Sequence, residues 1–164
     1  MLILCLSATM VWAERIDVST ARKVAENVAN AGSGLRSAGD LSLVYAAAPG
    51  KSGSALRSGT VDGAADYFVF NVSGNKGFVI VSGEDRALPV FGYSDEGAFD
   101  PDNLPDNLRY MLAYYQNQIT WLERSGIEVT ADIQAEWSHY LNGTNFRSTA
   151  QEVVLETAEW DQGK

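Results

Sequence analysis

Three segments of the chain place apolar residues three or four positions apart, which is the spacing of a helix with one buried face. The first covers residues 20–31, with Ser19 as its expected N-cap and Gly32-Ser33-Gly34 as its end. The second ends at Gly126, and its apolar stripe comprises Leu104, Leu108, Met111, Leu112, Tyr115, Ile119 and Leu122. The third covers residues 131–142 and stops at Gly143. We therefore expect a helix in each segment.

Shorter segments between the first two helices have the composition of strands. Residues 67–72 and 78–81 are mostly aromatic and β-branched, and the glycine-containing residues 73–77 between them predict a hairpin. Residues 41–45 alternate larger and smaller side chains, as a first strand would. Residues 89–93 predict a further strand, and its leading proline suits the edge of a sheet.

The order of these segments predicts one α+β domain. Strands linked by hairpins form an antiparallel sheet, and we expect three to four strands with the amphipathic helices packed on one face. Residues 46–65 are rich in glycine, serine and alanine and are expected to form a mobile loop. The length of 164 residues is that of a single domain.

Charge narrows the class of partner. The chain has 12 Lys and Arg against 21 Asp and Glu, a formal net charge of −9. Proteins that bind nucleic acid draw their affinity from cationic side chains, so no nucleic-acid partner is expected. An anionic membrane surface is disfavoured for the same reason.

Residues 1–13 have the pattern of a secretory signal peptide. They are uncharged and end in the Val11-x-Ala13 spacing that signal peptidase favours, so we expect cleavage after Ala13. The apolar run is shorter than the roughly 18 residues of a membrane span, so no stable membrane insertion is expected after removal. The one cysteine, Cys5, lies in this segment. We expect an exported protein, periplasmic or extracellular.

No arrangement of residues predicts an active site. Gly50-Lys51-Ser52 imitates a phosphate-binding loop but lacks the glycine five positions earlier. Residues 100–103 offer oxygen ligands without the glycine and glutamate of a calcium loop. His139 has no identifiable nucleophile or metal partner, which favours a packed structural role. The acidic pair Glu84-Asp85 is expected to be solvated on a turn. We predict no metal and no cofactor.

Several blocks of sequence resemble the pro-domain of streptopain-family cysteine proteases, also called the Spi-type inhibitor domain. The blocks are residues 67–72, 77–86, 90–94 and 97–100, followed by Asn107-Leu108 and Tyr115-x-x-Gln118-Ile119. The resemblance implies an inhibitory pro-region of an exported cysteine protease.

The last five residues, Trp160-Asp161-Gln162-Gly163-Lys164, are similar to the opening of the mature catalytic domain in that family. We therefore divide the chain into a signal peptide (1–13), an inhibitory pro-domain (14–143) and a pro-to-mature junction (144–164). The family's catalytic cysteine and histidine lie downstream of this motif. The resemblance thus implies that this chain is not itself an enzyme.

The resemblance also implies how the domain acts: it docks over the active-site cleft of a streptopain-like protease and keeps it as a zymogen. Asn107 matches an asparagine that meets the cleft, and Asn103, Pro105 and Asp106 are expected beside it as further contacts. The alternative makes Asn107 an ordinary first-turn helix residue, with Asn103 or Leu104 at the cap.

Other functions stay open from the sequence. Two alternatives to the zymogen pro-domain are a free-standing secreted inhibitor acting in trans and an intramolecular folding chaperone. A secreted surface-binding module is a third alternative, because Tyr110, Tyr114 and Tyr115 crowd one helix and aromatic residues anchor interfaces. Against it, these tyrosines are expected to line the boundary between helix and sheet.

Overall fold

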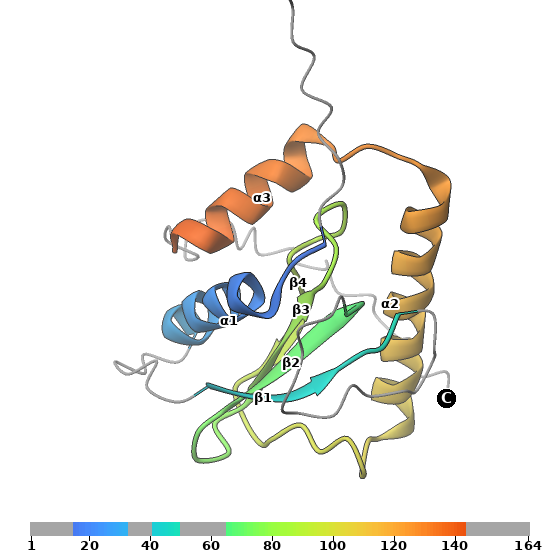
Figure 1. Cartoon of the computed structure of the whole chain (residues 1–164). Coiled ribbons are helices and arrows are strands. Elements are labelled where there is room, and N and C mark those ends of the chain that lie inside the picture. The colour runs from blue at the N-terminus through green and yellow to red at the C-terminus, as the bar shows by residue number, and fades with distance from the viewer. Residues whose placement is uncertain (1–14, 33–40, 50–64, 144–164) are drawn as a thin grey trace, which may run out of the picture.

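The computed structural model describes residues 15–32, 41–49 and 65–143, and it confirms the α+β class. Four strands form one antiparallel sheet in the order β1-β2-β3-β4 (Figure 1). The strands are β1 (Leu41–Ala46), β2 (Tyr67–Val72), β3 (Phe78–Ser82) and β4 (Val90–Ser94). The predicted hairpin and the edge position of the strand after Pro89 are both confirmed.

Three helices cover both faces of the sheet, which corrects the expectation that they share one face. Helices α1 (Val18–Gly32) and α3 (Ala131–Asn142) lie on one side, and α2 (Asp106–Ser125) lies on the other (Figure 1). No helix in the described part of the chain is long and apolar enough to cross a membrane.

The central strand β2 explains this two-sided arrangement. It is apolar at consecutive positions, and successive side chains of a strand point to opposite faces. Phe68 and Phe70 are buried in the cluster shared with α1 and α3, whereas Tyr67 and Val69 are buried in the cluster shared with α2. A strand with two apolar faces needs a cover on each.

The helix ends differ in part from expectation. Asp17, not Ser19, caps α1, because its Oδ1 accepts a 2.6 Å hydrogen bond from the Thr20 amide. That backbone hydrogen bond lowers the pKa of Asp17. Pro105 occupies the N-cap of α2 and makes no side-chain cap, so neither Asn103 nor Leu104 is the cap. Helices α2 and α3 end at the left-handed Gly126 and Gly143, as expected.

Residues at both ends of the expected mobile loop are instead packed. Ala47, Ala65 and Asp66 are fully buried, and the Asp66 amide donates to the Ala47 carbonyl at 2.9 Å. Residues 50–64 lie outside the described part of the chain. The same holds for residues 1–14, with the expected signal cleavage at Ala13, and for the expected junction after residue 143.

Two glycines of the family-like block allow close backbone approaches. A Cβ at Gly77, which has a φ of +105°, would lie 1.8 Å from the Ser94 carbonyl oxygen. A Cβ at Gly83 would lie 1.8 Å from the Ala65 carbonyl oxygen. Because neither glycine has a side chain, neighbouring segments can pack closely against both ends of β3.

Candidate inhibitory turn

The residues predicted to contact a protease lie in and just after the turn formed by residues 100–105, between β4 and α2. The base of this turn is fixed by Phe99, which is buried against Tyr45 and Phe78 with ring centroids 5.8 and 5.7 Å away. The Asn71 side chain from the end of β2 clamps the same point. Its Nδ2 donates to the Phe99 carbonyl at 3.0 Å, and its Oδ1 accepts from the Phe99 amide at 2.9 Å.

The turn has its own hydrogen bonds. The Asp100 carbonyl accepts from the Asn103 amide at 3.1 Å, and Asp100 Oδ1 accepts from the Asp102 amide at 3.0 Å. On the far side, Leu104 packs on the cluster beneath α2, and its carbonyl accepts from the Arg109 side chain at 3.0 Å. The turn is thus anchored at both ends and shaped from within.

The four predicted contact residues lie together in this turn and in the first turn of α2. Asn103, Pro105, Asp106 and Asn107 are all exposed. Asp106 makes only a solvated ion pair with Arg109, at 3.5 Å with the Asp106 side chain 99% exposed. Asn107 is a first-turn residue of α2, as the alternative interpretation has it, and its side chain has no hydrogen bond to any described residue. Its amide is therefore available to another molecule.

An exposed asparagine amide on an anchored turn can form hydrogen bonds with another protein. Asn107 offers two N–H donors and a carbonyl acceptor. Among the described residues no group of His, Cys, Asp and Glu side chains is placed to hold a metal ion. His139 lies on α3, across the sheet from the turn, and its ring meets the edge of Tyr140 at a centroid distance of 5.7 Å.

A buried polar network supports α2 from below, and its partners are far apart in the sequence. The fully buried Asp66 accepts from Gln116 Nε2 at 3.0 Å and pairs with Arg15 at 3.3 Å. Gln116 also donates to the Ala48 carbonyl at 2.9 Å, and Arg15 pairs with Glu123 near the C-terminal end of α2. This network joins the chain before α1, the sheet and α2.

A second ion pair corrects the expectation that Glu84 is solvated. Glu84 is 2% exposed, and its Oε1 accepts from Arg86 Nε at 2.6 Å. Burial raises the pKa of Glu84, but hydrogen bonds with Arg86 and Asp85 and the charge of Arg86 outweigh it, so the pKa lies below its usual value.

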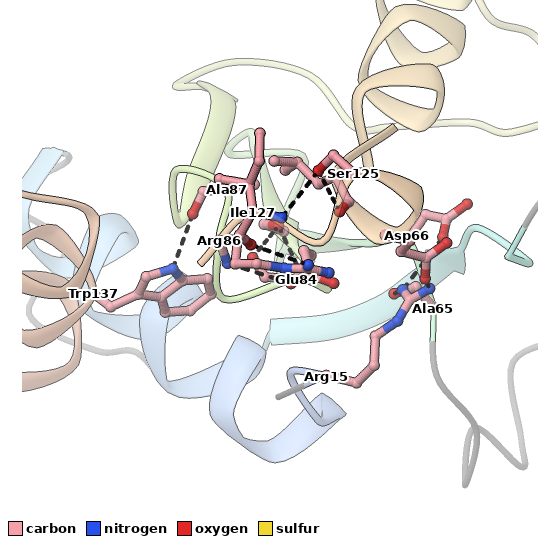
Figure 2. A network of polar contacts seen from close by, with 12 residues as sticks. Arg15, Ala65, Asp66, Glu84, Arg86, Ala87, Ser125, Ile127 and Trp137 are labelled. Atoms are coloured by element: carbon pink, nitrogen blue, oxygen red, sulfur yellow. Dashed lines mark hydrogen bonds and ion pairs between the residues drawn. The ribbon is translucent and has the colours of Figure 1, made fainter. Parts of the chain in front are cut away.

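The turn that carries this pair links two helices, as Figure 2 shows. Arg86 donates to the Ile127 carbonyl after α2 at 3.3 Å, and Trp137 of α3 donates to the Ala87 carbonyl at 3.0 Å. Glu84, Arg86 and their hydrogen-bond partners therefore connect α2 and α3. Sequence periodicity predicted these two helices only as separate elements. The residues that carry the family resemblance here have a structural role.

Comparisons with known proteins identify the family of this chain. A family model described as Spi protease inhibitor matches residues 13–119. The thiol protease/hemagglutinin PrtT of Porphyromonas gingivalis is 32% identical over 104 residues, which cover 59% of this chain and 11% of PrtT. No solved structure gives a significant match. Because the family model spans more than half of the sequence, the chain belongs to the Spi protease inhibitor family.

Proposed function

We propose that this domain blocks the active-site cleft of a streptopain-like cysteine protease by inserting the turn of residues 100–105 and the adjoining start of α2. The observation that carries the proposal is the anchored turn itself, which presents the exposed Asn107 amide within a domain of the inhibitor family. The relation to PrtT, a protein named as a thiol protease, supports a cysteine protease as the partner.

The rigidity of the turn favours inhibition. Ordering a flexible loop on binding costs free energy, and a turn already held at Phe99 and Leu104 avoids most of that cost. In the bound state Asn107 would donate to a carbonyl and accept from a histidine of the cleft. A side-chain amide at this place blocks the catalytic pair without offering a peptide bond for attack.

A zymogen is the setting in which such a domain needs only modest affinity. A tethered inhibitor faces its enzyme at an effective concentration of roughly millimolar. An intrinsic dissociation constant of about 1 μM would then leave about one enzyme in a thousand open. Cleavage of the link would remove this advantage.

We place the domain outside the cytoplasm, in the periplasm or beyond, with a signal peptide removed after Ala13.

The test is inhibition in trans. The purified chain is titrated into the thiol protease region of PrtT and into a streptopain-family enzyme, and the inhibition constant is measured with a peptide substrate. Inhibition by the wild-type chain is expected, and Asn107→Ala should weaken it at least tenfold.

The matched control is Gln134→Ala, which removes an exposed amide from α3, outside the predicted contact surface. It should leave the inhibition constant unchanged. If the wild-type chain in excess leaves both proteases fully active, the proposed function is wrong. An unchanged constant for Asn107→Ala alone would overturn the role of Asn107 and keep the domain's function.

A further inference from the structure

The middle of α2, between its charged ends, lacks the charges that a solvent-facing helix normally carries. Residues 110–122 contain no Asp, Glu, Lys or Arg, although such residues make up 20% of the chain. The polar face of a surface helix is ordinarily charged, whereas the centres of protein interfaces are depleted of charge.

Aromatic side chains occupy this uncharged side. Tyr110, Tyr114 and Trp121 are 78, 53 and 59% exposed. Gln118 lies between the last two and donates to the Tyr114 hydroxyl at 2.9 Å, so part of the surface is already ordered. We call these four residues the aromatic face. The expectation that the tyrosines line the boundary between helix and sheet is confirmed for Tyr115 alone, which stacks on Phe91 at 4.4 Å.

A shallow groove of about 280 Å³ continues the aromatic face towards the sheet edge. Its walls include Leu88, Phe91, Tyr115, Gln118, Trp121 and Leu122. Leu88 is itself 54% exposed. Two of these lining residues are fixed to each other, because the Tyr115 hydroxyl donates to the Phe91 carbonyl at 2.8 Å. An apolar hollow beside a ring of exposed aromatics is suited to take an apolar side chain of another protein.

We propose that the aromatic face and this groove form a second contact surface for the catalytic domain of the cysteine protease, next to the cleft that the turn enters. This inference rests on the proposed function and names the surface that provides most of the contact area. The expected occupant is an uncharged, apolar patch of the protease that places a side chain between Leu88 and Trp121.

Continuity with the inhibitory turn favours the protease over other occupants. Asn107, Tyr110, Tyr114, Gln118 and Trp121 follow one another at steps of three or four, so they lie along one side of α2. At a rise of 1.5 Å per residue this side is about 21 Å long. A molecule that touches Asn107 therefore meets Tyr110 one turn later.

The size of a stable interface supports the same occupant. Each partner of a specific complex typically contributes about 800 Å², or roughly 20 residues. The residues from 100 to 107 are too few for this, and the aromatic face is the uncharged surface that directly adjoins them. Tyrosine and tryptophan are also the residues that most often carry the binding energy of an interface.

The experiment compares inhibition by the full chain with inhibition by the double variant Tyr114→Ala/Trp121→Ala. We expect the inhibition constant to rise at least tenfold. The matched control is Tyr93→Ala, which removes an equally exposed tyrosine, 60% accessible, that pairs with Val79 on the α1 and α3 side of the sheet. Its inhibition constant should be unchanged.

Two results would overturn the inference while leaving the proposed function intact. One is an unchanged inhibition constant for the double variant when the wild-type chain inhibits. The other is a wild-type chain that sediments as a dimer and becomes monomeric in the double variant, which would identify a second copy as the occupant. Failure of the wild-type chain to inhibit at all would instead overturn the proposed function and, with it, this inference.

Discussion

The side chain of Asn71 exchanges two hydrogen bonds with the backbone of Phe99, one as donor and one as acceptor. Phe99 lies beyond the end of β4. The Asn71 side chain bonds both its amide and its carbonyl, as a neighbouring strand would. Phe99 sits directly before the turn that carries the predicted protease contacts. The geometry of that turn therefore depends on an asparagine in a different strand.

Replacing Asn71 by alanine should loosen the turn more than it harms the fold. The Phe99 amide and carbonyl would lose their partners, at a cost of about 1–3 kcal/mol in the free energy of unfolding. The turn would then need to be ordered on binding, so the inhibition constant should rise several-fold. Ser42→Ala, on the exposed cross-strand neighbour of Asn71, is the control. Equal inhibition by both variants would show that the clamp does not position the turn.

The ion pair of Glu84 and Arg86 should make stability depend on acid. The pKa of Glu84 in the folded protein lies below the value of 4.5 expected when unfolded. Ionised Glu84 therefore stabilises the fold fully above pH 4.5, and this stabilisation is lost as the pH falls through the lower folded pKa. Urea unfolding at a series of pH values should show a smaller acid-induced loss in Glu84→Gln than in the wild-type chain.

At neutral pH the same variant should be less stable by about 3 kcal/mol, since Arg86 would be left nearly buried without its charge partner. The control is Asp106→Asn, which removes a carboxylate from a largely exposed pair. That variant should unfold like the wild-type chain. A parallel pH dependence of Glu84→Gln and the wild-type chain would contradict the assignment.

Two glycine substitutions separate close packing from backbone freedom. Neither Gly83 nor Gly92 has a positive φ, but a Cβ at Gly83 would collide with the Ala65 carbonyl, whereas a Cβ at Gly92 meets nothing within 4 Å. We expect Gly83→Ala to lower the midpoint of thermal unfolding by many degrees. Gly92→Ala should be neutral or slightly stabilising, because alanine restricts the unfolded chain. Similar midpoints for the two variants would refute this account of Gly83.

Local sequence patterns predicted the helices and strands. They did not predict contacts between residues far apart in the sequence. The bounds of α3 and the terminators of α2 and α3 follow from apolar spacing and glycine. The burial of Asp66 does not, because its partner Arg15 lies 51 positions away. Covering both faces was implicit in the consecutive apolar residues of β2. The exposed contact residues were placed by resemblance, and their anchoring through Asn71 required the fold.

Replacing the two tryptophans of the described helices by alanine should have very different effects on the free energy of unfolding. Trp137 of α3 is 6% exposed and donates to the Ala87 carbonyl, whereas Trp121 of α2 is 59% exposed. Trp137→Ala removes a large core side chain and should lower the free energy of unfolding by about 3–5 kcal/mol.

Trp121→Ala removes no core contact of that kind, so its free energy of unfolding should stay within about 0.5 kcal/mol of the wild-type value. Chemical denaturation monitored by circular dichroism measures both variants. The same preparations then serve the inhibition assay. A stable Trp121→Ala chain with weakened inhibition separates binding from folding, because a merely misfolded inhibitor would lose both properties together. A destabilisation of Trp121→Ala as large as that of Trp137→Ala would mean that the aromatic face belongs to the core.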